Sequence, residues 1–217
     1  MAHQIFIVED HPVMRQGYAY LIDRQDDLEA CGEAESASEA IGAIADAEPD
    51  LVMMDLSLEG TSGIELTKQL QSRWPDLPIL VVSVHDETLY AERALRAGAR
   101  GYIMKSRAGA EVITGIRRIL QGQLYLSDTI RDRMLYQYLD RDDAGRDGSE
   151  LDALTDRELE VFENLGQGLT TKEVADAMNL SPRTVGTYRR RIMKKLGIGS
   201  SAELVRRAVE QAVSRGL

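Results

Sequence analysis

Short apolar runs recur along the first half of the 217-residue chain, and a polar or charged residue follows each of them. Residues 51–54 lead into Asp55, and residues 4–8 lead into Glu9 and Asp10. A run of four or five apolar residues between turn-forming residues is typical of a strand that is buried on both faces, as in a parallel sheet. The sequence therefore predicts a parallel sheet with carboxylates at the carboxyl ends of two strands.

Strand-like and helical segments alternate along this part of the chain. Strands are expected at residues 4–8, 28–34, 51–54, 79–82 and 102–104, and helices at 14–24, 38–47, 63–73, 87–96 and 112–120. Such alternation at short spacing predicts an α/β doubly wound five-stranded parallel sheet of the flavodoxin type. In that strand order the first and third strands are neighbours, and the fourth and fifth lie beyond the third.

The carboxylates of Glu9, Asp10 and Asp55 would meet at one edge of this sheet. Each acid alone could cap a helix or lie in solvent, but three acids together raise one another's pKa unless a cation lies between them. Mg²⁺ prefers oxygen ligands, accepts one or two carboxylates and bridges to phosphate. This clustering makes Asp55 a candidate acceptor of a phosphoryl group.

The composition is that of a globular protein, with 43% hydrophobic and 29% charged residues. No run of about 18 apolar residues occurs, and no signal-like segment opens the chain, so we expect no membrane association and a cytoplasmic location. The single cysteine, Cys31, excludes an internal disulfide. Three scattered histidines do not have the spacing of zinc ligands.

Five polar residues at successive strand ends resemble the pocket of the receiver domain of bacterial two-component response regulators, which has the CheY-like fold. They are Glu9, Asp10, Asp55, Ser83 and Lys105. The resemblance covers about the first 120 residues and implies a phosphoryl group on Asp55, donated by a sensor histidine kinase. It also implies Mg²⁺ bound by Glu9, Asp10, Asp55 and the backbone carbonyl of Ser57.

Further roles follow from the same resemblance. Ser83 would donate a hydrogen bond to the phosphoryl group, Lys105 would pair with it, and the ring of Tyr102 would turn inward in response. Taken singly, Ser83 could be a loop hydroxyl, Lys105 a surface charge and Tyr102 a core aromatic residue. Glu59 and Val84 depart from the residues that are common in the family, and either could alter the lifetime of the phosphoryl group.

Charge divides the chain unevenly. Residues 1–122 contain 11 basic and 20 acidic residues, whereas residues 151–217 contain 11 basic and 9 acidic residues. This asymmetry indicates a receiver domain at 1–122 and a second domain at 151–217 with a different partner. Between them, residues 123–150 are expected to form a connector helix and a flexible linker over 141–150. The apolar stripe of that helix would be formed by Ile130, Met134, Leu135, Tyr138 and Leu139.

Four helix starts mark the last domain. Thr155 with Glu158 and Thr170 with Glu173 have the spacing of capping boxes, Ser181-Pro182 is typical of a helix start, and Ser200 with Glu203 repeats the capping pattern. Four short helices with a tight turn between the second and third predict a small all-α four-helix helix-turn-helix domain.

The third of these helices has two different faces. Val185, Ile192 and Leu196 recur at helical spacing and are expected inward, with Tyr188 or Arg189 between them. Six basic residues and no acid lie from Arg183 to Lys195. A basic face is often merely solvated, but after a helix-turn signature in an acidic protein we interpret it as a surface for double-stranded DNA.

The motifs of this domain resemble the LuxR-type DNA-binding domain, and with a receiver in front they indicate a regulator of the NarL/FixJ type. The motifs are Leu154-Thr-x-Arg-Glu158, the segments 168–175 and 181–185, and Lys195-Leu196-Gly197. The implied DNA-binding residues are Arg183, Thr184, Gly186, Thr187, Arg190, Arg191 and Lys194. Gly186 stands where the family commonly has a basic residue, and Tyr188 where it commonly has a histidine. The family's usual contacts with DNA bases are therefore least safely carried over to these two positions.

The resemblance implies a transcriptional response regulator, not an enzyme, that dimerises and binds paired half-sites when Asp55 is phosphorylated. Two other hypotheses stay open. A phosphatase that uses an aspartyl phosphate would need a second acid at position 57, which is Ser57 here. A DNA-binding regulator that acts without phosphorylation would keep the acid pocket as a degenerate or structural feature.

Overall fold

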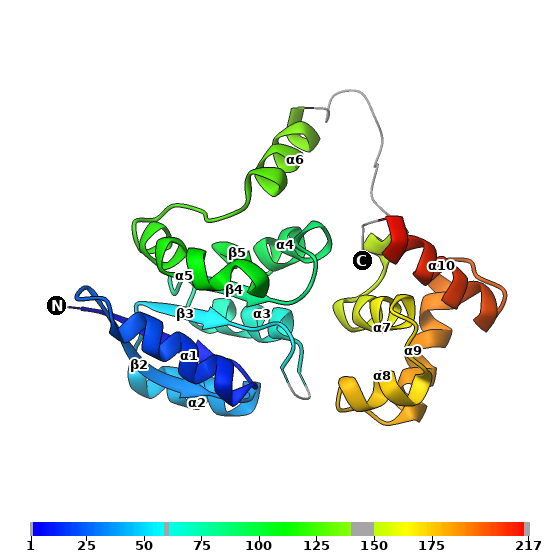
Figure 1. Cartoon of the computed structure of the whole chain (residues 1–217), viewed down its shortest axis with the longest axis horizontal. Coiled ribbons are helices and arrows are strands. Elements are labelled where there is room, and N and C mark those ends of the chain that lie inside the picture. Colours follow the sequence, from blue (N-terminus) through cyan, green and yellow to red (C-terminus); the bar gives the residue numbers. More distant parts are fainter. Residues whose placement is uncertain (1, 59–60, 140–149, 215–217) are drawn as a thin grey trace. The chain divides into compact units, whose positions relative to one another are not determined.

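The computed structural model describes residues 2–58, 61–139 and 150–214. The chain divides into two compact units, residues 1–142 and 143–217, which we call the front and rear units (Figure 1). Each unit has its own buried core. They are therefore described one at a time.

The front unit is a five-stranded parallel sheet with helices on both faces. Its strands are β1 (His3–Val8), β2 (Leu28–Ala34), β3 (Leu51–Met54), β4 (Ile79–Ser83) and β5 (Gly101–Met104), in the order β2-β1-β3-β4-β5. The strands alternate with α1 (Pro12–Asp23), α2 (Ala37–Ala47), α3 (Gly63–Arg73), α4 (Glu87–Arg96) and α5 (Lys105–Leu120). The predicted sheet and strand order are confirmed.

Alternate residues of the strands face two separate apolar layers. Ile5 and Ile7 pack in one layer with side chains of α1 and α5, whereas Phe6 and Val8 pack in the other with side chains of α2 and α3. A strand that is buried on both faces must be apolar throughout, which explains the uninterrupted apolar runs of the sequence. The polar residues are left for the strand ends.

Two helices begin earlier than their apolar periodicity predicted. Helix α5 begins at Lys105 and not at residue 112, because residues 105–111 are helical with only Ala108 buried against the core and so show no apolar periodicity. Helix α1 begins at Pro12 and not at residue 14, since proline is well tolerated in the first turn. Lys105 therefore lies in the first turn of a helix, directly after β5.

The connector helix α6 (Asp128–Leu139) packs by its first half only. Ser127 Oγ accepts a hydrogen bond from the Ile130 amide at 3.3 Å, and Ile130 is buried. Leu135 and Leu139, which belong to the predicted stripe, are 55% and 63% exposed, so these two residues of the stripe do not pack on the front unit. The side chain of Tyr138 and the expected linker at 141–149 lie outside the described residues.

Over residues 150–214, the described part of the rear unit, the chain forms a short 3-10 turn, η2, and four helices. Their bounds are η2 (Glu150–Ala153), α7 (Asp156–Gly166), α8 (Thr171–Ala177), α9 (Pro182–Lys195) and α10 (Ser201–Ser214). Both predicted capping boxes form, at Thr155 with Glu158 and at Thr170 with Glu173. A Cβ atom at Gly166 would lie 2.7 Å from the Ala208 carbonyl oxygen, so glycine is what lets α7 and α10 touch there.

Candidate functional site

An acid cluster occupies the carboxyl edge of the sheet, where β1 and β3 end side by side. Val8 and Met54 are in register, so the residues that follow, Glu9 and Asp55, become neighbours. The Asp55 amide donates to the Val8 carbonyl oxygen at 2.9 Å, which fixes the start of the loop. Ligand atoms of Glu9, Asp10, His11 and Asp55 all lie within 4.8 Å of one another, which brings the three predicted acids together.

Lys105 lies between the two buried acids. Its Nζ atom is 2.8 Å from Glu9 Oε2 and 2.8 Å from Asp55 Oδ2. Burial and the charge of Asp55 raise the pKa of Glu9, and the hydrogen bond from Lys105 offsets part of that rise. Burial alone would lower the pKa of Lys105, but Asp55 and Glu9 outweigh it and raise that pKa. Lys105 is therefore a charged ammonium group, and its single positive charge only partly neutralises the two carboxylates of Glu9 and Asp55.

One oxygen of Asp55 has no partner. The Oδ1 atom is buried and accepts no hydrogen bond from the residues that the structure describes. A buried carboxylate oxygen in that condition is costly unless a ligand completes its coordination. Glu9, Asp10 and Asp55 provide only hard oxygen donors, so the donor set fits a metal cation such as Mg²⁺.

Gly63 holds the loop after Asp55 against the start of α3. A Cβ atom at this position would lie 2.1 Å from the Asp55 carbonyl oxygen and 2.7 Å from Leu56 Cα, closer than any side chain allows. The Gly63 amide also donates to the Leu56 carbonyl oxygen at 2.9 Å. This glycine is required by a close approach of two backbone segments, and it positions Asp55.

His85 connects the other predicted pocket residues. This role of His85 was not predicted from the sequence. Tyr102, whose ring is buried, donates from its hydroxyl to the His85 carbonyl oxygen at 2.9 Å, and the His85 amide donates to the buried Ser83 Oγ at 3.3 Å. The His85 ring lies 3.1 Å from Ser57 Oγ and stacks on Tyr90 with ring centroids 4.4 Å apart. A lone histidine gives no periodic signal that could have predicted this.

Two more residues beside the cluster were not predicted. His11 Nδ1 lies 2.6 Å from Asp10 Oδ1, and Arg15 Nη1 donates to the Glu9 carbonyl oxygen at 2.7 Å. Their positions just after the acids, at the start of α1, are the only signal that the sequence offers. Val84 is 61% exposed at the rim, and Glu59 lies outside the described residues.

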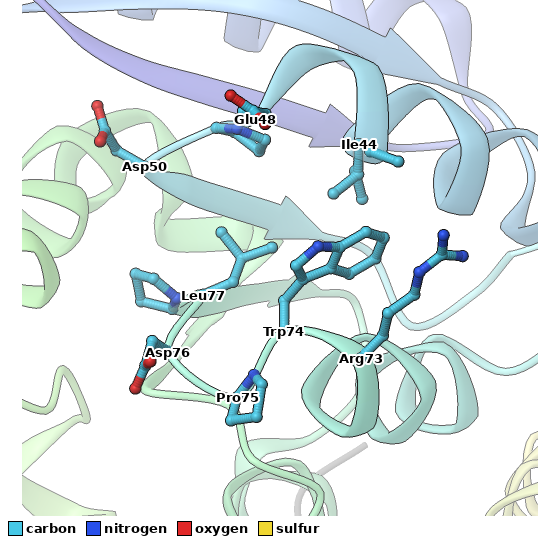
Figure 2. A pocket seen from close by; sticks show the side chains of 11 residues that line it. Ile44, Glu48, Asp50, Arg73, Trp74, Pro75, Asp76 and Leu77 are labelled. Atoms are coloured by element: carbon cyan, nitrogen blue, oxygen red, sulfur yellow. The ribbon is translucent and has the colours of Figure 1, made fainter.

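A separate hollow of about 560 Å³ lies at the opposite edge of the sheet (Figure 2). Its apolar lining includes Ile44, Trp74 and Leu77, and the guanidinium carbon of Arg73 lies 4.7 Å from the centre of the Trp74 ring. The hollow lies where β3 and β4 begin, away from the carboxyl ends of the strands, and the cluster of Glu9 and Asp55 does not line it.

The rear unit presents a basic face on α9. Arg183, Arg190, Arg191 and Lys194 are exposed, and Thr184, Gly186 and Thr187 are half-buried between them. A shallow hollow of about 250 Å³ is lined by Arg183, Thr184, Thr187, Tyr188 and Arg191. The opposite side of the helix buries Val185 and Ile192 fully and Leu196 partly, as predicted.

Two other basic residues of α9 are engaged within the unit. Lys195 Nζ lies 2.5 Å from Glu158 Oε2, and Arg189 donates to Thr171 Oγ1 at 2.5 Å and to Ser201 Oγ at 3.1 Å. These side chains hold α9 against its neighbours. The predicted DNA-binding set contains neither of them.

Both units match known protein families. Residues 5–117, more than half of the chain, match the model of the response regulator receiver domain, and residues 152–208 match that of bacterial regulatory proteins of the luxR family. The chain is a response regulator of the NarL/FixJ type.

Relatives resemble this regulator over nearly its whole length. The transcriptional activator protein ExaE of Pseudomonas putida is 36% identical over 97% of this chain and 98% of its own. The response regulator GacA of Pseudomonas viridiflava is 32% identical over 97% of both chains. These similarities support a DNA-binding transcriptional response regulator of a two-component system.

Solved structures are similar as well. A two-component response regulator of the LuxR family from Aurantimonas sp. SI85-9A1 is 34% identical, covers 64% of this chain and 99% of its own, and has a TM-score of 0.59. A structure of the RcsB–DNA complex, at 21% identity, covers 95% of this chain and 97% of its own with a TM-score of 0.58, which shows the shared fold. Among the described residues of the regulator, no helix has the length and apolar character needed to cross a membrane.

Proposed function

We propose that Mg²⁺-dependent phosphorylation of Asp55 by a sensor histidine kinase, or by a small acyl phosphate, switches this regulator. The observation that carries the proposal is the buried Oδ1 atom of Asp55, beside the Glu9–Lys105 pair, which has no hydrogen-bond partner among the described residues. A nucleophilic oxygen needs a lone pair that no hydrogen bond within the protein occupies. Lys105 keeps a positive charge 2.8 Å from the other oxygen of the same carboxylate.

The chain's own residues account for the transfer step. An Asp55 oxygen attacks phosphorus in line. The bond from phosphorus to the kinase's imidazole nitrogen, or to the acyl oxygen of the acyl phosphate, breaks, and that nitrogen or oxygen keeps the electron pair. Glu9, Asp10, Asp55 and the Ser57 carbonyl oxygen would hold Mg²⁺, which supplies positive charge to the phosphoryl oxygens. Lys105 then pairs with one of these oxygens, and Ser83 Oγ donates to another.

The signal leaves the pocket through His85. Ser83 and Tyr102 both bind the backbone of His85, so a move of the Ser83 hydroxyl toward the phosphoryl group alters the support of Tyr102 and α4. A changed α4 surface then favours a homodimer. Two rear units in a dimer engage paired half-sites on double-stranded DNA.

The exposed face of α9 would contact DNA. Its proposed contacts are Arg183, Thr184, Gly186, Thr187, Arg190, Arg191 and Lys194. The lack of acids on this face and its mixture of guanidinium, ammonium and hydroxyl groups support the assignment, because such groups bind phosphates and base edges. Within this proposal the receiver domain spans residues 1–122, the connector 123–150 and the DNA-binding domain 151–217. The protein is not an enzyme and acts in the cytoplasm, where the DNA lies.

The first experiment measures oligomeric mass with and without Mg²⁺ plus beryllium fluoride, a phosphoryl mimic. Wild type is compared with Asp55→Asn and with a control, Asp76→Asn, at an exposed acid on the opposite edge of the sheet. We expect dimers of wild type and of the control only when the mimic is present, and monomers of Asp55→Asn throughout. The same mass for all three proteins under both conditions would favour a regulator that acts without phosphorylation.

A further inference from the structure

Tyr18 places a polar atom in the core beneath the acid cluster. The residue is 4% exposed on α1 and packs in the apolar layer that includes Ile7 and Met53. Its hydroxyl is buried and has no hydrogen-bond partner within the part of the chain that the structure describes. A phenylalanine ring would fill the same space without an unpaired polar atom, so the hydroxyl is unexplained by packing.

The direction of this side chain leads to the acid cluster. Side chains of an α-helix slant toward its amino terminus. The amino terminus of α1 follows the carboxyl end of β1, where Glu9 lies. Ile7 and Met53, which pack in the same apolar layer as Tyr18, lie two residues before Glu9 and Asp55 in the chain, so this layer leads toward both acids. Burial and the negative charges of Glu9 and Asp55 raise the pKa of Tyr18, which agrees with this placement.

Lys105 is the cation that serves these carboxylates in the present structure, with contacts of 2.8 Å to each. A phosphoryl group on Asp55 would give the ammonium a new acceptor. Glu9 would then lose the contact of 2.8 Å from Lys105, and the carboxylate oxygen that does not face Mg²⁺ would need another donor. We propose that Tyr18 is a positioning residue of the phosphorylated pocket, whose hydroxyl donates to the Glu9 carboxylate, directly or through one water, when Lys105 turns to the phosphoryl group.

This inference rests on the proposed phosphorylation of Asp55 and separates two states of the protein. In the unloaded state the hydroxyl forms no hydrogen bond with the residues that the structure describes, so its removal costs none of those bonds. In the loaded state its removal takes a donor from Glu9. Tyr18→Phe should therefore weaken the loaded state alone, whereas a residue with a purely structural role would affect both states equally.

The test compares full-length wild type, Tyr18→Phe and Tyr20→Phe. Tyr20 is a matched control on the same helix, 61% exposed, with its hydroxyl 3.1 Å from Arg24 Nη1. Thermal unfolding without additions reports the unloaded state. A titration with beryllium fluoride at fixed Mg²⁺, followed by the rise in unfolding temperature, reports the loaded state.

We expect Tyr18→Phe to unfold at the same temperature as wild type or a higher one, and to bind beryllium fluoride about 3- to 10-fold more weakly, the range of one net hydrogen bond. Tyr20→Phe should match wild type in both measurements. Equal affinity in all three proteins would overturn the role of Tyr18 and leave that of Asp55 intact. A lower unfolding temperature of unloaded Tyr18→Phe, with unchanged affinity, would show a structural role instead. Failure of wild type to respond to the mimic would overturn both proposals.

Discussion

Each unit of the regulator buries a glutamate that pairs with a lysine, and the two pairs differ in how completely they are satisfied. In the rear unit, Glu158 accepts from the Thr155 amide at 2.8 Å and from Lys195 at 2.5 Å. In the front unit, Glu9 shares one lysine with Asp55, whose Oδ1 stays unpaired within the described residues. A complete pair fixes a helix start, whereas an incomplete one leaves room for a ligand.

The pKa values of the two glutamates shift in opposite directions for this reason. Burial and the nearby Asp55 charge raise the pKa of Glu9. Burial also acts to raise the pKa of Glu158, but the hydrogen bonds from Lys195 and Thr155 outweigh it and lower that pKa. A buried acid has a structural role where the hydrogen bonds that it accepts lower its pKa by more than burial raises it. Where burial has the larger effect, the acid is available for chemistry.

Removal of Lys105 should have the largest effect on stability. In Lys105→Ala the carboxylates of Glu9 and Asp55 stay buried without a cation, and we expect the free energy of unfolding to fall by about 2–3 kcal/mol at pH 7 without Mg²⁺. Added Mg²⁺ should recover part of the loss, because it provides positive charge between the same oxygens. Chemical denaturation with and without Mg²⁺ measures both effects.

Lys68→Ala is the matched control for that experiment. Lys68 pairs with Glu65 at 3.6 Å, and both side chains are about half exposed. Its removal should change the free energy of unfolding by less than about 0.5 kcal/mol. If Lys105→Ala and Lys68→Ala lower the free energy of unfolding equally, the contacts of Lys105 with Glu9 and Asp55 stabilise the front unit no more than an exposed ion pair does.

Glu158→Gln should have a smaller effect that depends on pH. The variant loses the charge that Lys195 binds and weakens the capping box, so the rear unit should lose about 1–2 kcal/mol at pH 7. Because the pKa of Glu158 in the folded state lies below its ordinary value of 4.5, its contribution is present above that pH and is lost as the pH falls toward the folded-state pKa. The two unfolding curves should therefore converge below pH 4.5.

Glu173→Gln provides the comparison, since Glu173 forms the same kind of capping box at an exposed site. We expect a smaller loss there than at Glu158. If the free energies of unfolding of wild type and Glu158→Gln differ by the same amount from pH 7 to pH 3, the charge of Glu158 does not stabilise the rear unit through Lys195.

Arg190→Ala should have the smallest effect on folding and a clear effect on DNA. Arg190 is exposed on α9, and its Nε atom lies 3.4 Å from the Gly186 carbonyl oxygen of its own helix, so it does not hold neighbouring helices as Lys195 does. We expect a change of less than about 0.5 kcal/mol in stability and a loss of about 1–2 kcal/mol in specific DNA binding. Arg206→Ala, at an exposed pair with Glu210 on α10, is the control. Equal DNA binding by Arg190→Ala and wild type would remove Arg190 from the interface.

The fold and the acid cluster could be predicted because both depend on periodic or terminal signals. Apolar runs gave the strands, and the ends of parallel strands necessarily share an edge, which brought Glu9 and Asp55 together. The start of α5 was placed too late because residues 105–111 bury only Ala108 and carry no apolar period. Boundaries that depend on propensity alone are weakly encoded.

Contacts between loops were not predictable in this way. His85 joins Ser57, Ser83 and Tyr102 through backbone atoms and one ring, and no spacing in the sequence encodes those distances. The sequence gives no signal for Tyr18, because only the structure shows that its buried hydroxyl has no hydrogen-bond partner among the described residues. Periodicity predicts which face a residue occupies and not which atoms it meets.

The contact between Gly63 and the Asp55 carbonyl oxygen makes a lever of α3. The Gly63 amide donates to the Leu56 carbonyl oxygen at 2.9 Å, so a displacement of the Asp55 loop would either break this hydrogen bond or move the first turn of α3. The helix extends from Gly63 to Arg73, which lies at the opposite edge of the sheet beside Trp74 (Figure 2). A movement of the whole helix would therefore change the hollow beside Trp74, on a surface of the same unit that is remote from Asp55.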